Sequence, residues 1–409
     1  MRARYSACLA AGLGLAVLTA AGSMSSGAHA AGTEAPASFN AGKIPGIKAV
    51  GPNYTITNPV RSDGFLRVYN VRSPYGNFTV VSDAMMQVRI RELAAVAELD
   101  KLTESNEFNS ALAQAGLAPV KFAGELLVNP VEALGNTFAG IGNQIGQIGS
   151  GINNAGKSQD QAFGGFGADQ KRRELAAKLG VDPYTDYEPL QARLQKLSQA
   201  AAAGGLVVTG AMMAIPGAVG IVVSNVGTSS RVKDSLRDRT AAQLMDMNRE
   251  KMMAMGLDRG TADALLQNRN YTPLDMTSMV SSLEVVPVPG RAEFLRRAVN
   301  VKRRDAAVFN RRYTEMVADY HLKNRSIVSF VSAAEFPFNQ TADGTVVGIW
   351  PVDALSWTDG TSRALTSAAS AIRSNRLGRP ALRISGQATP NAKEGLRELG
   401  FTVAENARR

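Results

Sequence analysis

Long runs without charge dominate the hydrophobic pattern of this chain. The stretch Leu197–Ser230 contains no ionisable side chain, and Lys196 and Arg231 border it. It exceeds the roughly 20 apolar residues that a membrane-spanning helix needs. However, Pro216 lies near its centre, and a proline kinks or ends a helix. The stretch therefore predicts either a bilayer span or two short helices in a protein core.

A second uncharged stretch, Ala133–Gly156, carries apolar side chains at the helical spacing of three and four. Asn129 and Pro130, just before it, are typical of a helix start. Glycine recurs at a constant interval, at Gly135, Gly142, Gly149 and Gly156. Small residues at a fixed helical position let another helix approach closely. We expect this helix to pack against, or insert with, Leu197–Ser230, although a buried helix in a soluble bundle fits the same pattern.

The two stretches supply the predicted contacts with a membrane or a protein partner. These contact residues are Ile141, Gly142, Ile145, Ile148, Gly149, Ile152, Val207, Val208, Pro216 and Val222.

The rest of the pattern predicts helices in the middle of the chain and strands towards both ends. Alternating residues around Pro74-Tyr75-Gly76 predict a β-hairpin. Ser82 precedes a helix from about Asp83 to Leu102, and a long helix is expected over Arg291–Leu322. From Ser326 onwards strands alternate with helices. The predicted fold is mainly α, a helical bundle with a Gly/Ala-rich hydrophobic helix pair, plus a small C-terminal α/β module.

These elements divide the chain into regions. The expected regions are a signal peptide (1–30), a flexible leader (31–60), a β-hairpin with helices (61–128), a Gly/Ala-rich helical region (129–232), a charged helical region (233–325) and the small α/β module (326–409).

The N-terminus is typical of a secretory signal peptide. A charged start and an apolar run precede Ala28-His29-Ala30, a small-x-small cleavage site. Removal of residues 1–30 takes away Cys8 and His29, which leaves no cysteine and one histidine, His321. Disulfides, Cys/His zinc sites and cysteine nucleophiles are then excluded, and we expect neither a metal nor a cofactor. We predict an exported bacterial envelope protein that is periplasmic, membrane-associated or secreted.

Positive charge gathers on the predicted helix Arg291–Leu322, in a chain whose net charge is +10. Such a helix either contacts anionic lipid headgroups or forms a solvated face. Nucleic acid is not an expected partner, because aromatic residues suited to base stacking are not interleaved. The predicted anion-contact residues are Arg296, Arg297, Lys302, Arg303 and Arg304.

Catalytic signals are weak. Asp353 and Asp359 lie beside Trp350 and Trp357, and a carboxylate pair is what glycoside hydrolysis requires. Their spacing fits no motif, so no residue is assigned as catalytic. Further on, Thr389-Pro390 predicts a helix start whose amides could hold an anion.

The leading interpretation is a non-enzymatic envelope protein that associates with membrane or a protein partner through its uncharged Gly/Ala-rich helices. Two alternatives stay open: a soluble periplasmic hydrolase acting on envelope polymer, and a secreted membrane-inserting effector or toxin. An enzyme is the less favoured class, and a homo-oligomer is compatible with the sequence.

Overall fold

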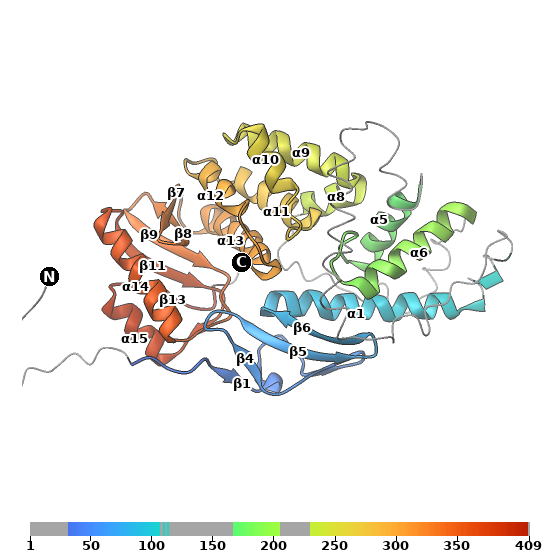
Figure 1. The fold of residues 1–409 in the computed structure, drawn as a ribbon, viewed down its shortest axis with the longest axis horizontal. Helices are drawn as coiled ribbons and strands as arrows, with labels where there is room; N and C mark the ends of the chain where they lie inside the picture. The colour runs from blue at the N-terminus through green and yellow to red at the C-terminus, as the bar shows by residue number, and fades with distance from the viewer. Residues whose placement is uncertain (1–31, 107–108, 111–112, 114–166, 205–229, 408–409) are drawn as a thin grey trace, which may run out of the picture. The chain divides into compact units, whose positions relative to one another are not determined.

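The computed structural model describes residues 32–106, 109–110, 113, 167–204 and 230–407 (Figure 1). All of them belong to one compact unit, which begins at Ala31. We describe this unit as an N-terminal sheet with its helices, a central set of helices and a C-terminal α/β region.

The N-terminal region forms sheet A, a curled antiparallel sheet. Its strands are β1 (Ser38–Phe39), β2 (Val50–Gly51), β3 (Tyr54–Ile56), β4 (Val60–Ser62), β5 (Arg67–Ser73) and β6 (Gly76–Val81). The predicted hairpin is β5–β6, and β3 and β4 pair with the other edge of β5. Alternation along β5 buries Tyr69 and Val71. The region 31–60, expected to be a flexible leader, contains β1 to β3 and the first residue of β4.

Nine described helices lie between the strands of sheet A and the next sheet in the sequence, and side chains cap the starts of α1, α9, α10 and α11. They are α1 (Asp83–Glu104), α5 (Ala168–Leu179), α6 (Glu188–Gly204), α8 (Ser230–Asp238), α9 (Ala241–Ala254), α10 (Arg259–Leu266), α11 (Pro273–Glu284), α12 (Arg291–Ala298) and α13 (Arg304–Lys323). Ser82 caps α1 by accepting a hydrogen bond from the Met85 amide at 3.2 Å. Thr240 and Thr272 begin α9 and α11 with capping boxes, which satisfy amides that a helix start leaves without partners.

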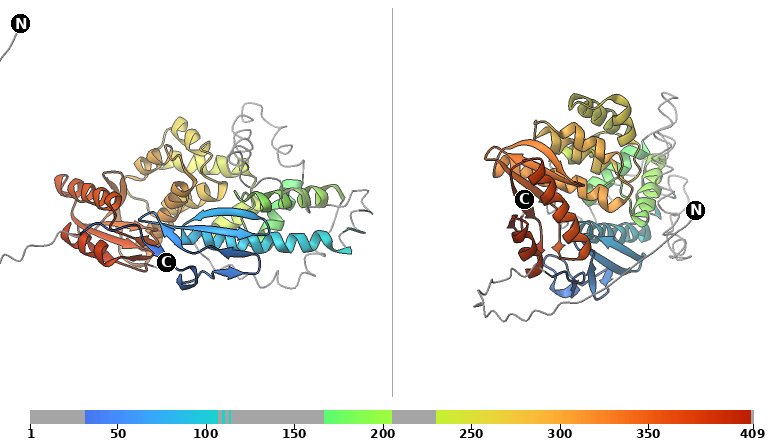
Figure 2. Two further views of the ribbon diagram at one scale, coloured as in Figure 1. Left: turned by 60° about the horizontal axis from the view of Figure 1, so that its bottom comes forward. Right: turned by 60° about the vertical axis from the view of Figure 1, so that its left-hand side comes forward.

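The C-terminal region forms sheet B, a mixed sheet with the order β13-β11-β9-β8-β7. Its strands are β7 (Ile327–Ala333), β8 (Phe336–Thr341), β9 (Thr345–Trp350), β11 (Arg379–Ile384) and β13 (Thr402–Ala404). Strands β9, β11 and β13 are parallel, and α14 (Asp359–Ser374) and α15 (Pro390–Glu398) connect them. Right-handed crossovers that step in one direction place both helices on one face of the sheet (Figure 2). A short parallel pair, β10 (Ala354–Leu355) with β12 (Gln387–Ala388), extends beyond β9 and β11.

The predicted fold class is wrong. The structure is not a mainly helical bundle with a small C-terminal module, because a curled antiparallel sheet and a large mixed sheet occupy the N- and C-terminal regions. The predicted long helix Arg291–Leu322 is two helices, α12 and α13, with residues 299–303 between them.

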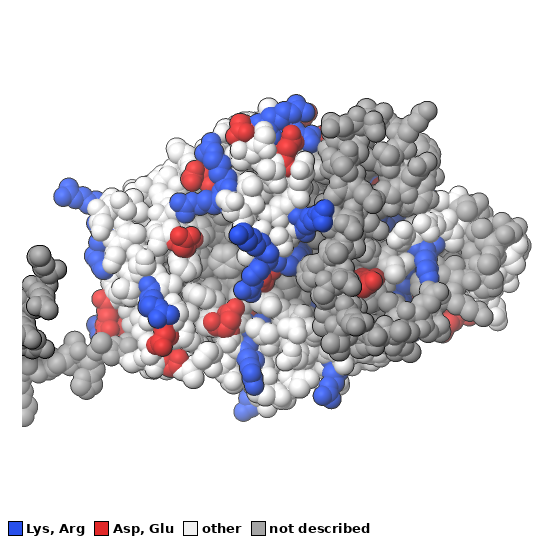
Figure 3. All heavy atoms as spheres, in the orientation of Figure 1, with Lys and Arg blue, Asp and Glu red and all other residues white. Residues whose placement is uncertain are grey.

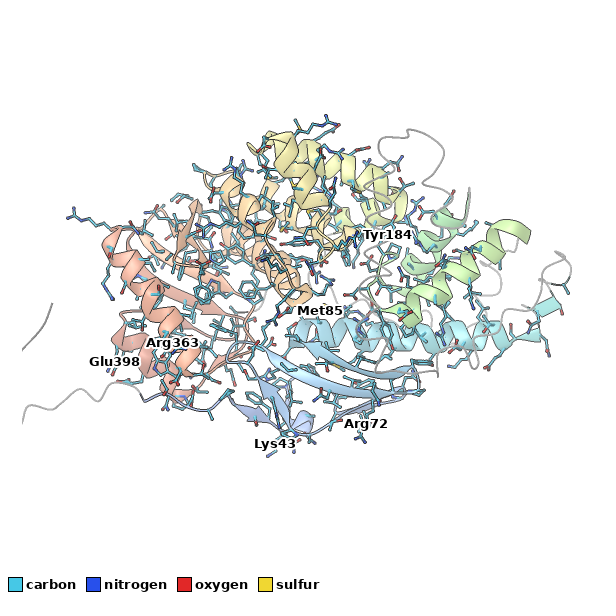
Figure 4. All side chains as sticks on the ribbon, in the orientation of Figure 1. Lys43, Arg72, Met85, Tyr184, Arg363 and Glu398 are labelled. Carbon is cyan, nitrogen blue, oxygen red and sulfur yellow. The ribbon has the colours of Figure 1, made fainter. Side chains whose placement is uncertain are left out.

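Two clusters of buried side chains hold these elements together. One joins sheet A to α1, α5 and α6, and the other joins α8–α13 to sheet B and its helices. Figure 4 shows Met85 at the start of α1, where sheet A, sheet B and α13 come together. Among the described residues, no helix combines the length and apolar character needed to cross a bilayer.

Candidate functional site

The predicted membrane or partner contacts, Ile141–Ile152 and Val207–Val222, lie outside the described residues. The described start of Leu197–Ser230 belongs to the core, because Leu197 and Ala201 are each 2% exposed. Both are on α6, which packs against α5 and α1.

The helices next to the two uncharged stretches meet at one end. Gly167, at the start of α5, lies beside the last turn of α6, since a Cβ built on it would be 3.9 Å from the Cβ of Ala202. Farther along, Arg193 of α6 binds both carboxylate oxygens of Asp100 near the end of α1, at 2.6 and 2.9 Å. The chain therefore enters α5 and leaves α6 at neighbouring points, and α5 and α6 pack side by side (Figure 1).

The five predicted anion contacts do not share one environment. Arg296 and Arg297 are about half exposed and both pair with Glu293. Arg303 pairs with Asp305, and Lys302 is exposed. On the face shown in Figure 3, acidic side chains lie among the basic ones.

Arg304, the fifth predicted contact, belongs to a buried ionic network. Its guanidinium lies 2.6 Å from Asp186 and 2.7 Å from Asp275. Arg89 of α1 reaches the other oxygen of Asp186 at 3.1 Å, and Arg311 reaches Asp275 at 2.8 Å. Burial opposes ionisation of Asp186, but Arg304 and Arg89 hold its pKa below the ordinary range. The network thus ties α1, α11 and α13 to the loop before α6.

The best-defined polar site outside this network is centred on Asp353, in the segment that follows β9. Its Oδ2 accepts the backbone amides of Arg67 and Asp83, at 3.1 and 3.0 Å. Asp83 is the first residue of α1, so Asp353 caps this helix from the opposite end of the sequence. Gly386 is required here, because an added Cβ would lie 1.9 Å from the Asp353 carbonyl oxygen.

A second carboxylate, that of Asp83, lies in the same site. The Arg67 guanidinium pairs with one Asp83 oxygen, and the Tyr69 hydroxyl donates to the other. Burial raises the pKa of Asp83, and burial followed by the charge of Asp83 raises the pKa of Asp353 to about 8. Like charges and desolvation both disfavour ionisation, so the site favours a proton on Asp353 at neutral pH.

A pocket of about 20 Å³ opens beside Asp353. Its walls come from the starts of β5 and α1, from α13, and from the ends of β9 and β11. Ser82, in its wall, has φ of 86°, a conformation that a residue with a side chain rarely adopts. The carboxyl ends of parallel strands are where ligands usually bind in open α/β sheets. This pocket, however, has room for about one water molecule.

The structure separates the two aspartates that the sequence suggested as a pair. Asp353 is 6% exposed and engaged with backbone amides, whereas Asp359 is exposed in the first turn of α14. Sequence reasoning missed Asp83, Tyr69 and Arg67, which are the actual neighbours of Asp353. Only the placement of Asp83 at a helix start was visible in the sequence.

No group of acidic, histidine or cysteine side chains suited to a metal ion occurs among the residues that the structure describes. Comparisons of this chain with protein-family models, with curated proteins and with solved structures find no match.

Proposed function

We propose that this chain is an exported, non-enzymatic envelope protein that binds a lipid bilayer through its two uncharged stretches, Ala133–Gly156 and Leu197–Ser230. The absence of charge over both stretches, and the regular glycines of Ala133–Gly156, motivate this proposal. Burying an apolar segment in a bilayer is favourable, whereas a charged side chain at its centre opposes insertion.

The observation that carries the proposal is the common attachment of both stretches. Gly167 comes after Ala133–Gly156 in the chain and lies beside Ala202, which is within Leu197–Ser230. Segments attached side by side to one packed group of helices can reach the same membrane surface together. The Arg193–Asp100 ion pair and the buried Leu197 fix that group to the core.

The alternatives receive less support from the geometry. A hydrolase of envelope polymer built on Asp353 needs an open cleft, but the pocket beside Asp353 has a volume of about 20 Å³. A secreted membrane-inserting effector shares every feature of the proposal and differs in the membrane that it targets.

Flotation with lipid vesicles tests the proposal, using residues 31–409, which include the whole compact unit. We expect the protein to float with vesicles and to resist alkaline carbonate extraction. Introducing charge by Ile145→Lys together with Val208→Lys abolishes flotation, because two charges then enter the apolar segments. Val50→Lys is the control, since Val50 lies on β2 and is 64% exposed.

Two results would overturn bilayer binding. One is wild-type protein that stays in the aqueous fraction with every vesicle composition; cross-linking to a single envelope protein would then identify a protein partner. The other is a double variant that floats as well as wild type. Comparing vesicles made from different bacterial or host lipids separates an envelope protein from an effector.

A further inference from the structure

The first described residues of the chain are attached to the C-terminal α/β region. The amide of Glu34 donates to the carbonyl oxygen of Trp357 at 2.9 Å. In return, the Trp357 amide donates to Glu34 Oε1 at 2.7 Å. The Thr389 hydroxyl donates to the same oxygen, and Asn391 Nδ2 donates to the Gly32 carbonyl oxygen at 3.3 Å. Glu34 thus donates to the backbone carbonyl of Trp357 and accepts from its backbone amide.

The carboxylate of Glu34 lies where two helices begin. Trp357 directly precedes Thr358, the N-cap of α14, and Thr389 is the N-cap of α15. The start of a helix carries partial positive charge and favours an anion. The two starts come together because Gly395 of α15 packs on the Trp357 indole, and a Cβ there would be 2.2 Å from the ring. Of the groups at the start of α15, it is the Thr389 hydroxyl that donates to the Glu34 carboxylate, while the Ala392 amide donates to the Thr389 side chain.

The rest of this segment is weakly held. Thr33, Ala35 and Pro36 are exposed. The next backbone hydrogen bond along the chain is the one that the Ala37 carbonyl oxygen accepts from Ser62 at 2.9 Å. Between Gly32 and Ala37, Glu34 is the residue that fixes the segment to the α/β region.

We propose that residues 32–37 form a detachable latch. We further propose that the site which holds Glu34, made of the Trp357 backbone and the Thr389 hydroxyl, binds glutamate in an extended peptide. The ligand must offer a backbone N–H to the Trp357 carbonyl and a carboxylate to Trp357 N–H and Thr389. Aspartate is one methylene shorter, so it cannot reach both positions from the same backbone. The latch fills this site in cis, and an equivalent glutamate peptide fills it in trans once the latch is released. This proposal does not depend on bilayer binding.

Peptide binding in trans tests the site. A fluorescent peptide with the sequence of residues 31–39 is titrated with residues 31–409 of the wild type, of Glu34→Gln and of Glu335→Gln. Glu335 is an exposed glutamate in the turn between β7 and β8, so its variant is the control. Fluorescence anisotropy is expected to show binding to Glu34→Gln, and roughly tenfold weaker binding to wild type and to the control, whose sites the latch occupies.

The chemistry of the ligand is checked with changed peptides. Peptides carrying Gln or Asp in place of the glutamate are expected to bind the Glu34→Gln protein roughly tenfold more weakly. The proposal is overturned if the folded variant does not bind the peptide, if the Gln peptide binds equally well, or if wild type binds as tightly as the variant. If circular dichroism shows that Glu34→Gln does not fold, a chain beginning at Ser38, which lacks the latch, takes its place in both titrations. The proposal is then judged by the same comparison of its peptide binding with that of wild type and by the same changed peptides.

Discussion

Replacing Asp353 with asparagine tests the site at the start of α1. An asparagine side chain has the same shape, and its carbonyl oxygen can accept the amides of Arg67 and Asp83 that Asp353 now binds. It cannot ionise, however. The comparison therefore isolates the free energy of placing a carboxylate, as opposed to a neutral group, at this buried position.

The direction of the pH dependence of stability follows from the pKa values of Asp353 in the folded and unfolded protein. In the folded protein, burial and the neighbouring Asp83 raise the pKa of Asp353 to about 8, from the usual value of 3.8 that applies to the unfolded chain. The folded state therefore keeps a proton that the unfolded state loses. The stability that this group contributes is complete below about pH 4 and is lost as the pH rises to about 8.

Between the pKa of Asp353 in the unfolded chain and its pKa in the folded protein, only the unfolded state has lost the proton. Over that range the folded state loses about 1.36 kcal/mol of stability for each pH unit. Between pH 5 and pH 8 the wild type should lose up to about 4 kcal/mol relative to Asp353→Asn. The two proteins should be similar in stability below about pH 4, and the advantage of the variant should grow from there to about pH 8.

Tryptophan fluorescence during urea unfolding measures this effect at the site. The chain contains 2 tryptophans, Trp350 and Trp357, and both lie in the α/β region near Asp353. Asp359→Asn is the control, because Asp359 is exposed and should leave the pH dependence of the wild type unchanged. The reasoning is refuted if the difference between wild type and Asp353→Asn stays constant from pH 5 to pH 8. It is also refuted if the variant is less stable at pH 8, since the ionised form would then be the better helix cap.

Two further substitutions test the packing and the buried charges. Gly395→Ala should destabilise the α/β region by about 1–3 kcal/mol, because its Cβ would meet the Trp357 ring at 2.2 Å. Gly360→Ala on α14 should be neutral or stabilising, and equal unfolding midpoints in urea for the two variants would contradict this reasoning. Arg304→Ala should cost about 3–5 kcal/mol, because it leaves two buried carboxylates short of a partner. The exposed neighbour Arg303→Ala should cost less than about 1 kcal/mol; similar losses for both arginines in thermal unfolding would show that Arg304 is not part of a buried network.

The sequence predicted those elements whose signals are local. The hairpin β5–β6 follows from alternation on both sides of a turn, and α1 follows from Ser82 before a helical pattern. Sheet A as a whole was missed, because β1 to β4 are two or three residues long and cannot show a period. Strand β8 was missed as well, since Pro337 interrupts a segment that reads as a strand only beside β7 and β9.

The polar sites were less predictable than the elements, because their partners are distant in sequence. Asp353 was recognised as a candidate, but it was paired with Asp359, which is near it in sequence. Its actual partners, Arg67 and Asp83, precede it by 286 and 270 residues. Glu34 gave no sequence signal, since a carboxylate in a Pro/Gly-rich segment looks like any solvated residue until α14 and α15 are seen together.

Contacts between residues distant in sequence also determine which of the chain's positive charges lie at the surface. A net charge of +10 suggests a surface that attracts anions, and the sequence pattern predicted that one side of a helix over Arg291–Leu322 would carry much of that charge. In the structure this segment is broken into two helices, and Arg304 and Arg311 turn inward to hold carboxylates of other elements. Charge that neutralises buried acids cannot attract an anionic lipid surface. The proposed membrane affinity is therefore expected to come mainly from the uncharged stretches.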